Sequence, residues 1–314
     1  MEKAVTAMNK QTRDDIQYRL FPLLEAEYGV CVKHMTIIKP HVWIIDSDRG
    51  NWILKKYPSF FEASRQQMFI RLLKKAQFQA APSIEGMVLF QSAYWTLQTY
   101  IPSSRTFTFA DEEDRNAGIL LLKEYHSCSP QLLHHPFLTT MIPRYPLYEK
   151  WKQRYQLFLY YLPAMKRIMV NEELSFMLQC AQYFFEQFPK FFHSFTLEEN
   201  AVIHGDVASH NFLRTEQGTT YLIDYDLIAV APPSIDYLQY ANRILPHVQW
   251  SLAYLERWAA FQSLLAKPWF LVALLFPADF MRECRFLVRR NKPFSLPDFE
   301  RRKQFVQKII DVIR

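Results

Sequence analysis

The sequence has 314 residues, of which 50% are hydrophobic and 16% are aromatic, so it is long enough for two lobes that each bury a core. This composition excludes an intrinsically disordered chain. The net charge of +6 fits an anionic ligand such as a nucleotide. Because the basic residues are scattered along the chain, we expect no nucleic-acid partner.

Three features bear on where the protein resides. The four cysteines lie far apart and form no metal-binding pair, which is typical of reduced thiols in a cytosolic protein. The first fifteen residues lack the apolar segment of a signal peptide. The longest apolar run, Trp269–Pro277, is too short to cross a bilayer. We therefore expect a soluble, cytoplasmic protein with no membrane partner.

The first hundred residues carry the pattern of a small mixed domain. Apolar residues at helical spacing predict helices over Asp14–Tyr28 and Phe60–Gln77. β-Branched and alternating segments predict five strands, at Cys31–Lys39, Val42–Asp46, Trp52–Tyr57, Met87–Phe90 and Tyr94–Tyr100. The sequence therefore predicts a five-stranded sheet with one inserted helix over residues 1–101.

After Pro102 the pattern changes to long amphipathic helices, so residues 102–314 are expected to form a second, mainly helical domain. These helices are predicted at Ala110–His126, Tyr148–Tyr161, Glu172–Phe188, Trp250–Leu265, Pro268–Leu287 and Pro297–Ile313. The predicted fold class is therefore α+β, with a small β-rich lobe followed by a larger helical lobe.

Two short apolar runs interrupt the helical half, and each ends in polar residues. Ala201–Ile203 is followed by Asp206 and Asn211, and Tyr221–Ile223 is followed by Asp224. We interpret the two runs as a strand pair that brings these side-chain oxygens together. Carboxylate and amide oxygens are the ligands that Mg²⁺ prefers, and a carboxylate is suited to orienting a hydroxyl.

Phosphoryl transfer needs a base for the attacking hydroxyl, a cation that bridges the phosphates, and a positive group on the phosphates that stay behind. Asp206 is the candidate base, and Asn211 and Asp224 are candidate magnesium ligands. Lys55, on the third predicted strand, is the candidate for the α- and β-phosphates. Asp226 is open to two interpretations, a second metal ligand or a charge on the substrate side.

These segments resemble the aminoglycoside phosphotransferase and choline kinase superfamily, a relative of the protein kinases. The resemblance rests on HGD at 204–206, Asn211 and IDYD at 223–226, and on LK at 54–55 followed by WTLQTYIP at 95–102. It covers roughly residues 32–290. It implies a two-lobed, protein-kinase-like fold with an antiparallel sheet in the N-lobe, which binds the nucleotide.

The resemblance also assigns roles by position. It makes Asp206 the catalytic base, Asn211 and Asp224 the metal ligands and Lys55 the phosphate lysine. It implies ATP and Mg²⁺ as cofactors and a small-molecule acceptor bound between the helices of the C-lobe.

Two further roles follow from the same comparison. The nucleotide base is expected against the hinge strand, with backbone groups of Thr99 and Ile101 as its hydrogen-bond partners. Asp236, in the segment APPSID, matches an aspartate that ties the catalytic loop in place.

Within the superfamily, the sequence is most similar to the spore-coat (CotS-like, YutH-type) kinases of endospore-forming bacteria. The similarity rests on YEKWKQR at 148–154 and LLFPADF at 274–280. It implies a location in the spore coat and other spore-coat proteins as partners.

Three positions depart from the family pattern. The catalytic loop reads VASH at 207–210, and residues 34–49 contain no glycine, so the turn at Lys39–His41 takes the place of the phosphate loop. The helix position expected to carry a glutamate partner for Lys55 falls near Arg65 and Gln66.

Two hypotheses from different classes follow. The first is an ATP- and Mg²⁺-dependent phosphotransferase that acts on a hydroxyl of its acceptor. The second is a kinase-like structural protein of the spore coat that retains the fold and binds a partner without catalysis.

Overall fold

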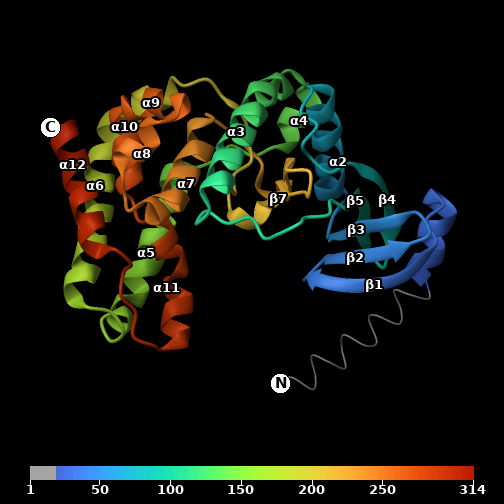
Figure 1. Ribbon diagram of the computed structural model, residues 1–314, viewed down its shortest axis with the longest axis horizontal. Coiled ribbons are helices and arrows are strands. Elements are labelled where there is room, and N and C mark those ends of the chain that lie inside the picture. The colour runs from blue at the N-terminus through green and yellow to red at the C-terminus, as the bar shows by residue number, and fades with distance from the viewer. Residues whose placement is uncertain (1–18) are drawn as a thin grey trace. The chain divides into compact units, whose positions relative to one another are not determined.

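The alternating segments of the first hundred residues form a five-stranded antiparallel sheet in the order β1-β2-β3-β5-β4, as the sequence predicts (Figure 1). The computed structural model describes residues 19–314. The strands are β1 Val32–Lys39, β2 Val42–Ser47, β3 Gly50–Tyr57, β4 Ile84–Phe90 and β5 Ala93–Thr99. The centre of the sheet is aromatic, with the rings of Trp43 and Trp95 packed 4.9 Å apart.

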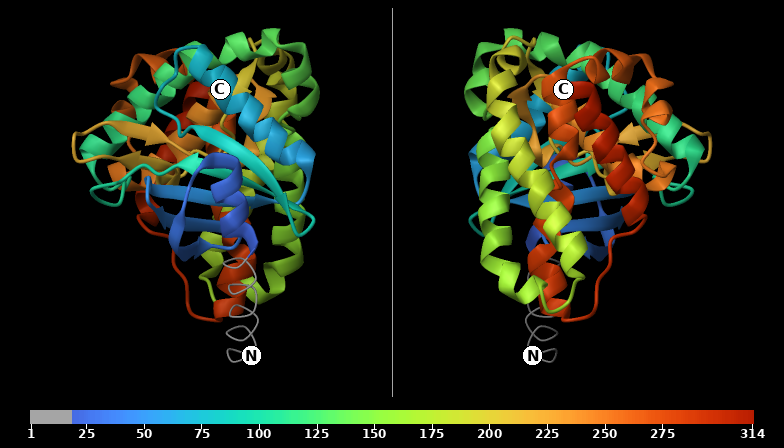
Figure 2. Two further views of the ribbon diagram at one scale, coloured as in Figure 1. Left: turned by 90° about the vertical axis from the view of Figure 1, so that its right-hand side faces the viewer. Right: turned by 90° about the vertical axis from the view of Figure 1, so that its left-hand side faces the viewer.

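Two helical segments pack on this sheet. The predicted helix over Asp14–Tyr28 begins outside the described residues, and its part at 19–28 is helical and contributes Leu20 and Leu24 to the core of the sheet (Figure 2). Helix α2, Phe60–Lys75, begins at Ser59, whose hydroxyl accepts a hydrogen bond from the backbone N–H of Glu62 (3.2 Å).

The chain divides into two compact units. Unit 1 holds the sheet and α2, together with Gln131–Ile142 and Phe212–Asp226. Unit 2 comprises Phe107–Pro130, Pro143–Asn211 and Leu227–Arg314. Unit 1 therefore includes helix α4, Pro136–Met141, and the segment that carries Asp224 and Asp226.

The predicted pairing of the two short apolar runs is wrong. Strand β6, Ala201–Ile203, pairs with β9, Ala229–Ala231, whereas β8, Thr220–Leu222, pairs with β7, Phe212–Arg214. Strands β7 and β8 are close in sequence and join through a tight turn in which Gly218 has a φ of +81°, so their pairing closes only a short loop. Each run thus belongs to a different unit.

Unit 2 is mainly helical, in agreement with the predicted fold class. Its helices are α3 Glu112–Cys128, α5 Leu147–Met165, α6 Asn171–Thr196, α7 Ser234–Ile244, α8 Leu252–Glu256, α9 Ala259–Leu265, α10 Pro268–Leu275, α11 Ala278–Arg290 and α12 Phe299–Ile313. Short 3₁₀ turns occur within unit 2 at Ser209–Asn211 and Leu245–Val248, and at Ser129–His134 and Tyr225–Leu227, where the chain passes from one unit to the other. Helix α7 directly follows β9 and carries the predicted structural aspartate, Asp236.

Two of the predicted long helices are broken. Trp250–Leu265 forms α8 and α9, and Pro268–Leu287 forms α10 and α11. The second break lies at Phe276, which has an extended backbone because a proline follows it. Helices α5 and α11 lie side by side, so the break turns the chain toward α5 (Figure 1).

Within residues 19–314, no single helix is long and apolar enough to cross a membrane. One pair of helical segments, Ala259–Leu265 and Pro268–Arg290, has the length and apolar composition of a membrane span only when the two are counted together. The two segments meet at an angle of 96°.

Candidate functional site

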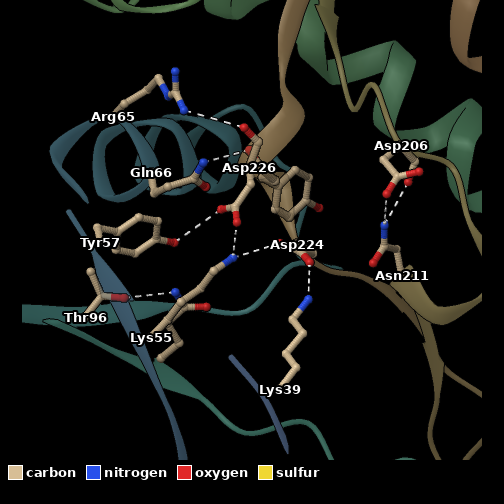
Figure 3. Close-up of polar contacts among 12 residues, drawn as sticks. Lys39, Lys55, Tyr57, Arg65, Gln66, Thr96, Asp206, Asn211, Asp224 and Asp226 are labelled. Carbon is tan, nitrogen blue, oxygen red and sulfur yellow. Dashed lines mark hydrogen bonds and ion pairs between the residues drawn. The ribbon is translucent and has the colours of Figure 1, made fainter. Parts of the chain in front are cut away.

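Lys55 is the centre of a charged cluster in unit 1. It lies on β3 opposite Val42 of β2 and Thr96 of β5, and only 9% of its surface is exposed. Its Nζ lies 2.7 Å from Oδ1 of Asp224 and 2.7 Å from Oδ2 of Asp226 (Figure 3). A buried ammonium ion is costly unless it is paired, so this lysine and the two carboxylates depend on one another.

The second oxygen of Asp224 binds a further cation. Lys39, at the end of β1, places its Nζ 2.7 Å from Oδ2 of Asp224. Burial by itself would raise the pKa of Asp224, but Lys55 and Lys39 hold it well below its ordinary value. Asp224 is therefore a carboxylate at every physiological pH.

The backbone of Asp224 has a φ of +65°, a left-handed conformation that is unfavourable for a residue with a Cβ. Such strained residues persist where the surrounding structure holds them, and they cluster at functional sites. Here the two lysines hold the side chain, and this explains how the strained turn is maintained.

Helix α2 supports the same turn with an amide in place of a carboxylate. Gln66 is 3% exposed, and its Nε2 donates a 2.7 Å hydrogen bond to the backbone carbonyl of Tyr225. The ring of Tyr225 packs against Phe69 of α2, with centroids 5.2 Å apart. The sequence position expected to hold a glutamate for Lys55 therefore fixes the backbone of the aspartate turn, and Asp226 supplies the second carboxylate.

Asp206 and Asn211 lie in unit 2, on the loop that follows β6. The side-chain amide of Asn211 donates to the backbone carbonyl of Asp206 (2.8 Å) and lies 3.4 Å from its Oδ2. Nη2 of Arg243, from α7, lies 3.3 Å from Oδ1 of Asp206. The side chain of Asp206 is half-buried and accessible, as a base that meets a substrate has to be.

Asp236 fixes the beginning of this loop. It is fully buried, and its two oxygens accept hydrogen bonds from the backbone N–H groups of His204 (2.7 Å) and Gly205 (2.9 Å). Nε2 of His126 lies 3.1 Å from Oδ2 of Asp236. Burial opposes ionisation, but His126, His204 and the Gly205 N–H together hold the pKa of Asp236 below its ordinary value.

Gly205 permits the turn between His204 and Asp206. Its φ is +78°, and a Cβ added at this position would lie 2.2 Å from the carbonyl oxygen of Leu227. We expect Gly205→Ala to destabilise the protein by about 1–3 kcal/mol, because the added methyl group meets rigid backbone in a strained conformation. Chemical denaturation measures this loss. Gly218→Ala is the matched control, since its φ is also positive but nothing lies within 4 Å of the added Cβ.

The two residues predicted to bind the nucleotide base, Thr99 and Ile101, differ in whether their backbone groups already form hydrogen bonds. The N–H of Thr99 donates to the carbonyl of Ser83 at 2.9 Å. The backbone of Ile101 forms no hydrogen bond with the part of the chain that the structure describes, so its groups are open to a ligand.

The donors for a metal fall in both units. Asp224 belongs to unit 1 and Asn211 to unit 2, and no group of three His, Cys, Asp or Glu side chains between residues 19 and 314 is arranged to hold a metal. Oδ1 of Asn211 accepts no hydrogen bond from the described residues. Taken singly, the carboxylate of Asp224 and the amide oxygen of Asn211 are each hard oxygen donors, the kind that Mg²⁺ prefers.

Sequence reasoning missed the pairing of Lys39 with Asp224, the pairing of Asp226 with Lys55, and the roles of Gln66 and Arg243. The sequence carried a signal for Asp226, which lies two residues after Asp224 in IDYD. The other three contacts join segments far apart in the chain, and no local pattern marks them.

The model of a phosphotransferase enzyme family matches residues 38–269 of the chain. An aminoglycoside phosphotransferase from Alicyclobacillus acidocaldarius has a similar structure, with a TM-score of 0.67, 14% identity, and 92% of this chain and 94% of that chain covered. The choline kinase LicA from Streptococcus pneumoniae is also similar, with a TM-score of 0.53 and 12% identity, and the match covers 94% of this chain and 99% of that chain. No curated protein sequence matches this chain. The fold is that of the kinase-like phosphotransferases, and because the matched region spans most of its length, the chain belongs to the phosphotransferase enzyme family.

Proposed function

We propose that the protein transfers the γ-phosphoryl group of ATP to a hydroxyl of a small acceptor. The observation that carries this proposal is the buried Lys55 held at 2.7 Å by both Asp224 and Asp226. A lysine fixed on a strand beside an acidic turn is the arrangement that phosphoryl transfer uses to hold the non-transferred phosphates. Two similar structures support a nucleotide: one is a spectinomycin phosphotransferase with AMP, and another is the same enzyme with ADP and spectinomycin.

In the proposed reaction, the acceptor oxygen forms a bond to the γ-phosphorus while the bond to the bridging oxygen breaks and ADP leaves. The hydroxyl proton passes to the carboxylate of Asp206, which Arg243 and Asn211 orient. Lys55 holds the phosphates that remain on the nucleotide, and the backbone of Ile101 together with the Thr99 carbonyl meets its base. When bound, Mg²⁺ neutralises phosphate charge, with Asp224 and Asn211 as its ligands from the protein.

The similarity to the spore-coat kinases leads us to propose that the protein acts in or near the spore coat. The segment at 148–154 that carries this similarity lies in α5, and the segment at 274–280 spans the end of α10, the break and the start of α11. Partners among other coat proteins belong to the same proposal.

One observation favours the second hypothesis, a kinase-like structural protein. Gln66 takes the position of the expected glutamate and donates to the Tyr225 carbonyl. Lys55 therefore has no carboxylate partner at this position of α2 that would remain if Asp224 and Asp226 bound a metal instead. A protein that retains the fold only to bind a partner has no need of that charge.

A thermal-shift titration separates the two hypotheses. We expect ATP with Mg²⁺ to raise the Tm of the wild-type protein, since a ligand at 100 times its Kd adds about 2.7 kcal/mol to the stability. Lys55→Met is expected to abolish the shift relative to its own unliganded Tm. Lys56→Met is the matched control, because the neighbouring lysine lies 5.4 Å from the ring centroid of Trp95 and not in the carboxylate cluster. No shift of the wild type at millimolar ATP would exclude the enzyme and favour the structural protein.

A further inference from the structure

The helices of unit 2 enclose a cavity of about 350 Å³ beside Asp206. Its walls come from α5, α7 and the start of α11, together with the loop of Gly205 and Asp206. All of these segments belong to the same compact unit. The cavity is large enough for a metabolite of a few carbon atoms, and the proposed base lines it directly.

The charge of the cavity is positive. Four basic side chains line it, against the two carboxylates of Asp206 and Asp279; the four are Lys150, Arg154, Arg243 and Arg282. Each carboxylate already has a cation of its own, because Arg243 lies 3.3 Å from Asp206 and Arg282 lies 3.3 Å from Asp279. The remaining two cations are Lys150 and Arg154.

Neither Lys150 nor Arg154 forms an ion pair with any residue in the described part of the chain. The ammonium of Lys150 lies over the ring of Tyr145, 4.5 Å from its centroid, and Nη1 of Arg154 lies 3.5 Å from the carbonyl oxygen of Ala278. Both side chains are half-buried on one face of α5, one turn apart. Two partly desolvated cations without a carboxylate leave an electrostatic cost that an anionic ligand would remove.

The protonation behaviour agrees with this geometry. Burial and the neighbouring Arg154 lower the pKa of Lys150. Burial likewise lowers the pKa of Arg154, and Arg282 acts in the same direction. A negative group bound between the two would act in the opposite direction and raise both pKa values.

We propose that this cavity is the acceptor site and that the acceptor carries an anionic group, a carboxylate or a phosphate, bound by Lys150 and Arg154 while its hydroxyl faces Asp206. This proposal rests on the proposed function and specifies its substrate class. A polycationic acceptor would meet four basic side chains in the cavity and is excluded by repulsion.

A binding experiment without nucleotide tests the acceptor class separately from catalysis. Three compounds serve as probes: glycerol 3-phosphate, its uncharged counterpart glycerol, and the cation choline. We expect thermal stabilisation of the wild-type protein by glycerol 3-phosphate alone. Lys150→Gln and Arg154→Gln should each weaken this binding by about 10- to 100-fold, the value of a charge-assisted hydrogen bond. Lys152→Gln, an exposed position on the same helix, should leave it unchanged.

Covalent labelling supplies a second measurement that locates the site. Pyridoxal 5′-phosphate forms an imine with an uncharged lysine amine, with loss of water, and borohydride reduces the imine to a stable amine. We expect peptide mass spectrometry to find the label on Lys150, and we expect Arg154→Gln or omission of the phosphate (pyridoxal) to reduce it. ATP should protect Lys55 from the label and leave Lys150 accessible.

The outcomes are distinct. If glycerol or choline stabilises the wild type as well as glycerol 3-phosphate does, or if the binding and the label survive Arg154→Gln, the anionic acceptor is excluded while the phosphotransferase proposal stands. If ATP protects Lys150 as well as Lys55, the cavity belongs to the nucleotide and the acceptor assignment is wrong. Failure of ATP to stabilise the wild type counts against the proposed function alone.

Discussion

Asp206→Asn is expected to lower the rate of ADP release by about 10²- to 10⁴-fold, the usual contribution of a general base. Asparagine has nearly the same shape, so the hydrogen bond from Asn211 to the backbone carbonyl of residue 206 should remain. The amide cannot accept the hydroxyl proton, however, and it offers Arg243 no charge. The loss should therefore appear in kcat, measured by coupled detection of ADP with the acceptor present.

The control for this experiment is the affinity for ATP. Asp206 belongs to unit 2, while Lys55 and the aspartates that bind it belong to unit 1, so the ATP-dependent thermal shift of Asp206→Asn should equal that of the wild type. Asp311→Asn, on the exposed face of α12, makes the same chemical change away from the site and should leave kcat unchanged. Full activity of Asp206→Asn would show that another group takes the proton.

The local parts of the site were predictable from the sequence because they lie in short motifs. Asp206 and Asn211 are five residues apart, and the structure joins them within one loop. Asp224 lies two residues after strand β8, and the strand pattern of the first lobe correctly located Lys55 on the third strand of the sheet. In each case the backbone pattern next to the residue determines its position.

The pairing of the short strands was not predictable in the same way. Strand β6 has three apolar residues, and so little pattern specifies no partner. The structure pairs it with β9, whose sequence Ala229–Ala231 is equally apolar. Asp236, which lies five residues after β9, accepts hydrogen bonds from the two N–H groups that follow β6 and so joins the ends of the two paired strands. A buried contact of this kind depends on the tertiary fold.

The same reasoning explains why the role of Gln66 could not be predicted from its position. Counting along the predicted helix places the expected glutamate position near Arg65 or Gln66, and in the structure Gln66 is buried and donates to the Tyr225 carbonyl. Counting does not show that Lys55 already has two carboxylates from a turn about 170 residues later in the chain. With both present, a third carboxylate from α2 would add a buried negative charge. The neutral amide avoids this charge and still binds the Tyr225 carbonyl.

Asp236→Ala is expected to lower the free energy of unfolding by about 3–5 kcal/mol, because it leaves two buried N–H groups without an acceptor and His126 without its partner. Urea denaturation measures the loss. Asp236→Asn is the informative second variant: it retains one oxygen for one N–H but turns a donor toward the other, so its cost should be intermediate. A loss below about 1 kcal/mol for Asp236→Ala would show that the loop does not depend on this carboxylate.

The pH dependence of the protein's stability is a second test of the interactions of Asp236. The folded pKa of Asp236 lies below the ordinary value of 3.8, so in acid the unfolded chain binds this proton more readily than the folded one does. The stabilisation by Asp236 is therefore complete above about pH 5 and is lost as the pH falls through the folded pKa. The difference in stability between the wild type and Asp236→Asn should accordingly be constant from neutral pH to about pH 5 and shrink below it. A difference that grows in acid would mean that the buried carboxyl group is protonated in the folded protein, and its hydrogen bonds to the His204 and Gly205 N–H groups would then come from a neutral acid.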